Sequence, residues 1–111
     1  MADAAQTPEL ALRYLAEMST DIRAAAILDR AGALAAAKGA DGERMRELTA
    51  ELFERAGEGV AQVEVRGADG GVFAVRERGW TIAAVTGRFA LPSLTFYDLR
   101  RVIGDLEAEA A

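Results

Sequence analysis

The stretch VAQVEVRGADGGVFAVRERGWTIAAVTGR, residues 60–88, decides the fold. It contains three short segments with the composition of β-strands, at Ala61–Arg66, Val72–Glu77 and Trp80–Thr86, separated by glycine-bearing turns. The first segment alternates between apolar and polar residues. The third is apolar on both faces, which is typical of a strand in the middle of a sheet. The stretch therefore predicts a three-stranded meander whose last strand has a further strand beside it.

Residues 22–38, IRAAAILDRAGALAAAK, contain a candidate for that further strand. Alanine, leucine, arginine and lysine all favour a helix here. Against this, the segment 29–32 begins with Asp29 and ends with Gly32, the preferred ends of a type I turn, and short apolar runs of strand length flank it. The residue pattern leaves helix and hairpin open, but a hairpin supplies the neighbour that the meander lacks. We therefore expect a hairpin with strands near Ala24–Leu28 and Ala33–Ala37.

Three other stretches carry helical patterns. Thr7-Pro8-Glu9 begins the first, Asp41 caps the second before the punctuating Gly57, and Ser93 is expected to cap the third after Pro92. Each has an apolar stripe at helical spacing, with Asp98 outside the third stripe and Glu51 and Arg55 spaced for an ion pair on the second helix. The residues expected in the core are Leu10, Tyr14, Leu15 and Met18; then Met45, Leu48, Thr49, Leu52, Phe53 and Ala56; then Leu91, Phe96, Tyr97, Leu99, Val102, Ile103 and Leu106.

The elements follow in the order helix, hairpin, helix, meander, helix. At 111 residues the chain has room for one hydrophobic core, so we expect a single domain over residues 1–111 with flexible ends at about 1–6 and 107–111. The fold class is α+β, an antiparallel sheet of about five strands with helices on its faces.

The composition excludes several kinds of chemistry. The chain has no cysteine and no histidine, which removes disulfides, thiolate metal sites and the commonest general base. No spacing resembles a calcium loop, and the acidic residues between Glu43 and Glu58 are typical of a solvated helix face. We therefore expect no catalytic residue, no metal and no cofactor.

Two further local features have structural interpretations. The loop Gly67-Ala68-Asp69-Gly70-Gly71 lacks the Lys-Ser/Thr pair of a P-loop and precedes a strand, so it is better interpreted as a hairpin turn. Trp80 opens a strand beside a tight turn and is expected to serve packing or an interface. A net charge of -5 argues against nucleic-acid binding, and no signal peptide or apolar span is visible, so a cytoplasmic protein without membrane insertion is expected.

Three strings, DIRAAAILDRAGALAAA, GGVFAVRERGWTIAAVTGR and LPSLTFYDLRRVIGDL, resemble the roadblock family, named for dynein light chains of the roadblock type. The resemblance runs from about Pro8 to Leu106. It implies the profilin-like order α-β-β-α-β-β-β-α, with a five-stranded sheet in the order 2-1-5-4-3. It also implies a homodimer in which first meander strands pair at their edges and middle helices pack together. The implied dimer interface is Ala61, Gln62, Val63, Glu64, Val65, Arg66, Leu48 and Leu52.

The family's relatives include bacterial regulators of Ras-like GTPases, some of which act without an arginine finger. The resemblance therefore implies a noncatalytic dimeric regulator or scaffold that binds a small Ras-like GTPase, and the alanine, arginine and glycine bias is typical of a GC-rich bacterial genome. The candidate partner surface on the middle helix is Arg44, Glu47, Glu51 and Arg55, for which plain solvent exposure is the alternative. Alternative functions are an adaptor for a motor or signalling complex, and binding of a small ligand between sheet and helix.

Overall fold

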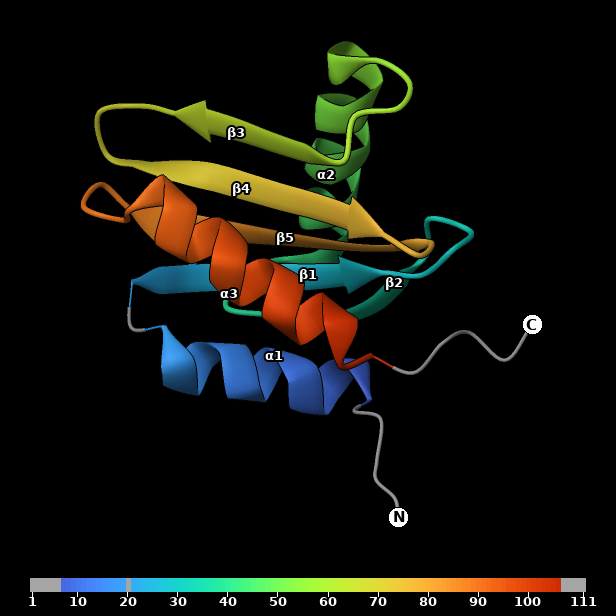
Figure 1. The fold of residues 1–111 in the computed structure, drawn as a ribbon, viewed down its shortest axis with the longest axis horizontal. Coiled ribbons are helices and arrows are strands. Elements are labelled where there is room, and N and C mark those ends of the chain that lie inside the picture. Colours follow the sequence, from blue (N-terminus) through green and yellow to red (C-terminus); the bar gives the residue numbers. More distant parts are fainter. Residues whose placement is uncertain (1–6, 20, 107–111) are drawn as a thin grey trace.

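A computed structural model describes residues 7–19 and 21–106. The expected flexible ends, at about 1–6 and 107–111, lie outside these residues. In Figure 1 an antiparallel sheet separates α1 and α3, on one face, from α2 on the other. The elements are α1 (Pro8–Met18), β1 (Ile22–Leu28), β2 (Leu34–Lys38), α2 (Gly42–Ala56), β3 (Gln62–Arg66), β4 (Gly70–Glu77), β5 (Trp80–Gly87) and α3 (Pro92–Gly104).

The sheet has five strands in the order β2-β1-β5-β4-β3, so the predicted topology and the α+β fold class are confirmed. The last strand of the meander is central, as its two apolar faces indicated. It pairs antiparallel with β1 through Ile27 and Ile82, and with β4 through Val75 and Ile82. None of the described helices is long and apolar enough to cross a lipid bilayer.

Residues 22–38 form the β1–β2 hairpin and not a helix, because the Asp29 side chain stabilises the turn. The Asp29 carboxylate accepts hydrogen bonds from the backbone N–H groups of Ala31 and Ala33, each at 2.9 Å. Gly32 has φ of +85°, a conformation that favours glycine. The two apolar runs then pair across the turn, and tertiary pairing with β5 outweighs the preference of alanine for helices.

The two faces of the sheet bury side chains of different sizes. On the α2 face, Ala26, Ala83 and Ala74 lie side by side on adjacent strands, forming a row of methyl groups. Helix α2 supplies the bulk of that layer through Met45 and Phe53. The alanine-rich hairpin therefore serves as the floor beneath a helix with large side chains.

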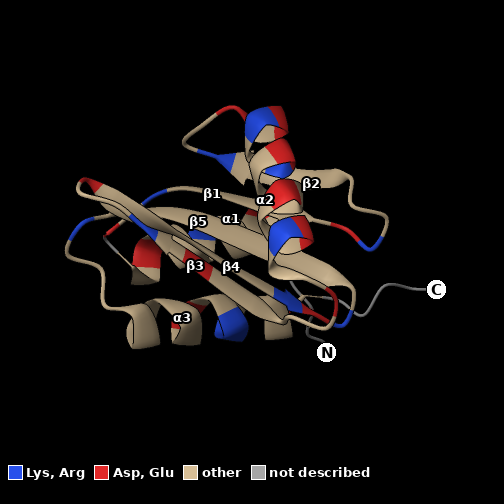
Figure 2. Ribbon diagram, turned by 90° about the horizontal axis from the view of Figure 1, so that it is seen from above, with Lys and Arg blue, Asp and Glu red and all other residues tan. Residues whose placement is uncertain are grey.

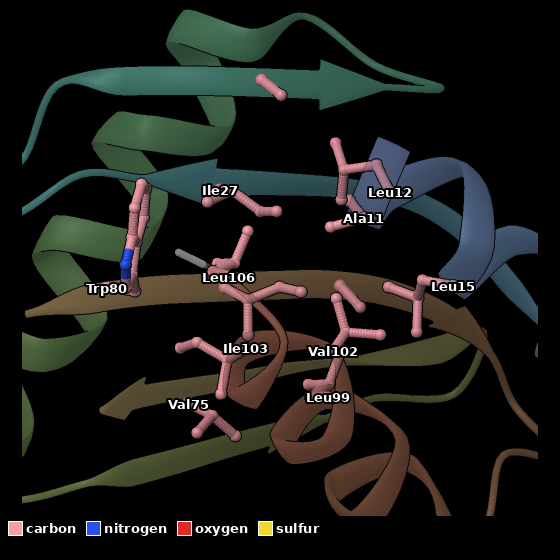
Figure 3. Packing of buried hydrophobic residues seen from close by; sticks show 14 of the residues in the cluster. Ala11, Leu12, Leu15, Ile27, Val75, Trp80, Leu99, Val102, Ile103 and Leu106 are labelled. Carbon is pink, nitrogen blue, oxygen red and sulfur yellow. The ribbon is translucent and has the colours of Figure 1, made fainter. Parts of the chain in front are cut away.

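The opposite face holds the larger core, shown in Figure 3. Phe73, Ile27 and Ile82 are almost completely buried there under α1 and α3. The ring of Phe73 meets that of Phe96 edge to face, with centroids 5.3 Å apart. Trp80 is buried in the same cluster, in agreement with its predicted packing role.

The phase of two helices differs from the prediction. Leu10 is 48% exposed, because α1 turns Ala11 and Leu12 toward the sheet together with the predicted Leu15. Leu91 and Tyr97, expected in the core, are 64% and 58% exposed. The residues that α3 buries are instead Thr95, Asp98, Leu99, Val102 and Ile103.

The N-cap of α3 and the burial of Asp98 also differ from the prediction. Pro92 is the first helical residue and Leu91 the N-cap, which makes no side-chain capping hydrogen bond, so the expected cap at Ser93 is wrong. Asp98, expected outside the packed stripe, is only 8% exposed and is one of the buried residues of α3, a helix that contacts both the sheet and α1. This burial raises the pKa of the Asp98 carboxyl, and the nearby charge of Arg101 opposes the rise.

Candidate protein-binding site on strand β3 and helix α2

Strand β3 is an edge of the sheet. It pairs with β4 on one side, with Val63 opposite Ala74 and Val65 opposite Val72, and no other described strand lies on its far side. The ladder also fixes which backbone groups are free. The carbonyl of Ala61 accepts a hydrogen bond from the N–H of Arg76, and the N–H of Gly67 donates to the carbonyl of Gly70. The backbone N–H and C=O groups of the odd-numbered residues of β3 therefore point toward β4. The N–H and C=O groups of Gln62, Glu64 and Arg66 therefore point outward from the edge.

An apolar groove runs beside this edge on the α2 face. Its volume is about 460 Å³. Val65 and Leu48 lie in it with 48% and 38% of their surface exposed, more than is usual for residues of this size in a packed element. The lining residues are Leu48, Glu51, Leu52, Arg55, Ala56, Val63 and Val65. The edge strand thus combines free backbone groups with an exposed apolar floor, the two features that strand pairing between chains uses.

The charges around the groove pair with one another. Arg55 and Glu51 form the predicted i,i+4 ion pair at 2.9 Å. On β3 itself, Arg66 lies 3.6 Å from Glu64. These pairs are exposed, and each contributes about 0–1 kcal/mol to stability. Figure 2 shows charged residues concentrated on the outward side of α2, with the sheet beneath it mainly uncharged.

The residues predicted for the dimer interface fall into two groups. Leu48, Leu52, Val63 and Val65 line the groove together. The remaining four do not line it: Ala61, which immediately precedes β3, and Gln62, Glu64 and Arg66. The side chain of Gln62 accepts a hydrogen bond from Arg100 of α3, on the other face of the sheet, and Arg100 also lies 3.4 Å from Glu77.

The residues predicted for partner binding are also divided. Glu51 and Arg55 lie on the groove, whereas Arg44 and Glu47 are exposed on α2 without lining it. Sequence reasoning placed Ala56 in the core rather than at the groove, since a small residue at the end of a helix gives no signal of an interface.

The groups at this site are of kinds suited to association with another chain. No group of three or more His, Cys, Asp or Glu side chains that could hold a metal ion occurs within residues 7–19 and 21–106. Asp98, whose pKa is raised, belongs to α3 on the other face of the sheet. The groove offers apolar side chains, paired surface charges and unpaired backbone groups.

Comparison with solved structures identifies the fold. A roadblock/LC7 domain from Streptomyces avermitilis aligns with a TM-score of 0.78 at 19% identity, covering 89% of this chain and 93% of that one. The gliding protein MglB from Thermus thermophilus aligns with a TM-score of 0.66 at 17% identity, covering 96% and 95%. An MglB in a tetrameric arrangement aligns with a TM-score of 0.65 at 21% identity, covering 99% and 90%.

No family model matches the sequence, and no curated protein matches it either. At these identities the structural likeness establishes the fold. The resemblance to the roadblock family is therefore confirmed as a shared architecture over nearly the whole described chain.

Proposed function

We propose that this chain forms a homodimer through β3 and α2, and that the dimer is a noncatalytic regulator or scaffold of a small Ras-like GTPase. The observation that carries the proposal is the open edge of β3 beside an exposed apolar groove. An edge strand without proline, bulge or covering loop is a template for pairing with a second chain. A two-fold axis across β3 offers each copy the same surface, as most homodimers require.

Antiparallel pairing of two β3 strands joins the two five-stranded sheets into one. The outward backbone groups of Gln62, Glu64 and Arg66 then acquire hydrogen-bond partners. Val65 and Leu48, exposed in the single chain, become covered by the second α2. Opposite charges at Glu64 and Arg66 exchange partners across the axis, which favours the antiparallel register.

The GTPase as partner is supported by the roadblock fold and by the family resemblance of the sequence. In the dimer, Arg44 and Glu47 remain on the outward side of α2, beside the rim residues Glu51 and Arg55. Two helices related by the axis then present these charges together as a polar surface flanking an apolar seam. Such a surface suits a reversible partner, because charged side chains at a rim set orientation and association rate more than affinity.

The direct test is a titration of the purified protein with the Ras-like GTPase of the same organism, loaded with a non-hydrolysable GTP analogue or with GDP. We expect binding that prefers one nucleotide state, and weaker binding when Arg44 and Glu47 are both changed to serine. The matched control changes Arg13 and Glu17, a pair on the exposed side of α1, to serine. Absence of binding in both nucleotide states would contradict regulation of a GTPase. It would favour the alternative, an adaptor that docks a motor or signalling complex on the same dimer.

A further inference from the structure

A second hollow lies on the other flank of α2. It is an open cleft of about 690 Å³ that shares no lining residue with the groove beside β3. Its walls are the turn between β1 and β2, the C-terminal half of α2 and the turn between β4 and β5. Figure 1 shows the two turns at the same end of the sheet. None of its lining residues belongs to the surface proposed for the dimer.

The floor of the cleft is a row of three residues on adjacent strands. Leu28 pairs with Thr81, and Thr81 pairs with Arg76, so the three side chains stand on the α2 face of the sheet. Thr81 is only 7% exposed, yet its hydroxyl makes no hydrogen bond with another described side chain or with the described backbone. A buried hydroxyl without a partner is unfavourable, and a ligand in the cleft supplies one.

Two arginines, Arg30 and Arg76, line the cleft. The guanidinium of Arg76 lies 4.2 Å from the centre of the Phe53 ring and donates to the carbonyl of Val60 at 3.1 Å. These contacts hold it over the floor. Arg30 lies against the β4–β5 turn, where a Cβ on Gly79 would come within 2.8 Å of its Nε. Within the described part of the chain, neither arginine forms an ion pair.

Two acidic side chains also line the cleft. Glu54 and Glu58 lie at the C-terminal end of α2, and the structure gives neither an ion pair with another described residue. The negative end of the helix dipole lies at the same place. Asp29 is the third acid of the cleft. Its carboxylate accepts hydrogen bonds within the β1–β2 turn and is therefore not assigned to a ligand. The cleft also has apolar lining residues, Ala31 and Ala50, which are exposed, and Leu28, which is nearly buried.

We propose that this cleft binds a small zwitterion with an apolar body, of the class of free amino acids and dipeptides. Its carboxylate pairs with Arg30 and Arg76, its ammonium group with Glu54 and Glu58, and its side chain lies on Leu28, Ala31 and Ala50. Thr81 donates to or accepts from the polar middle of the ligand. The volume falls within the range of about 300–1,000 Å³ that small-molecule sites occupy. This inference does not depend on the dimer or on a GTPase.

The test is isothermal titration of the full chain with the twenty free amino acids and with leucyl-leucine. Leucyl-leucine is then compared with its N-acetylated and C-amidated forms. We expect saturable binding of an unblocked compound and a loss of about tenfold or more in affinity on blocking either end, since each blocked end removes one charge-assisted contact. Preference for free amino acids over leucyl-leucine identifies which member of the class binds.

Two variants assign the ends of the ligand. Arg30→Gln should weaken binding of the unblocked dipeptide but not that of the C-amidated form, and Glu54→Gln should weaken the unblocked but not the N-acetylated form. Arg44→Gln, on the outward side of α2, is the matched control and should bind like the unaltered chain. All three side chains are exposed, so folding is checked by an unchanged thermal unfolding midpoint. Absence of saturable binding by every compound would overturn the proposal, as would equal affinity for blocked and unblocked dipeptide.

Discussion

Replacing Val65 with lysine should dissociate the proposed dimer without unfolding the chain. Complete burial of a valine side chain contributes about 1.5–3 kcal/mol. Val65 is 48% exposed in the single chain, so about half of that contribution, roughly 1 kcal/mol, remains to be gained at the interface. Two-fold symmetry doubles the loss to about 2 kcal/mol, which is about 30-fold in the dissociation constant. Two lysines brought close to the axis add repulsion, so 30-fold is a lower bound.

The assay is sedimentation velocity over a concentration series, with the thermal unfolding midpoint measured in parallel. Leu94→Lys is the matched control, because Leu94 is 55% exposed on α3, on the opposite face of the sheet from the groove. We expect the control to sediment like the unaltered chain and Val65→Lys to sediment as a monomer at the same concentration. An unchanged dimer in Val65→Lys, or equal dissociation in both variants, would refute the assignment of the groove to the dimer.

Three predictions concern stability. Asp98→Asn should raise the free energy of unfolding at pH 7. Burial raises the pKa of Asp98 from 3.8, so above the raised pKa the ionised carboxylate destabilises the folded chain. The advantage should shrink as pH falls toward 3.8, and chemical denaturation at several pH values measures it. Asp29→Ala removes two hydrogen bonds from the β1–β2 turn and should cost about 1–3 kcal/mol in the same assay, against a near-neutral Asp69→Ala. Gly39→Ala should cost about 2 kcal/mol or more, because φ is +87° and the new Cβ would lie 2.3 Å from the carbonyl oxygen of Arg23; Gly104→Ala, with open space, is its control.

The parts of the fold that the sequence predicted are those controlled by local chemistry. Asp29 and Gly32 mark a turn whatever surrounds them, and the two apolar faces of β5 indicate a central strand. The alternation of Val63 and Val65 likewise predicted which side chains share a face of the edge strand. These features depend on residues a few positions apart, so they are visible along the chain.

The parts that were mispredicted depend on what covers a helix. Spacing at Leu10 or Tyr97 gives the period of an apolar stripe, but its orientation depends on neighbouring elements. Asp98 is buried on a helix that contacts both the sheet and α1, and no residue near it in sequence indicates those contacts. The lining of the cleft could not be predicted from the sequence either, since the register of three strands brings Leu28, Arg76 and Thr81 together.

Hydrogen exchange of single backbone amides, followed by NMR, tests whether two β3 strands pair. The amides of Gln62, Glu64 and Arg66 point away from β4 and are free in the single chain. We expect all three amides to be protected at concentrations where the dimer forms. Val65→Lys should abolish this protection, while the amides of residues 63 and 65 stay protected by β4. Rapid exchange of the three outward amides at every concentration would contradict the pairing.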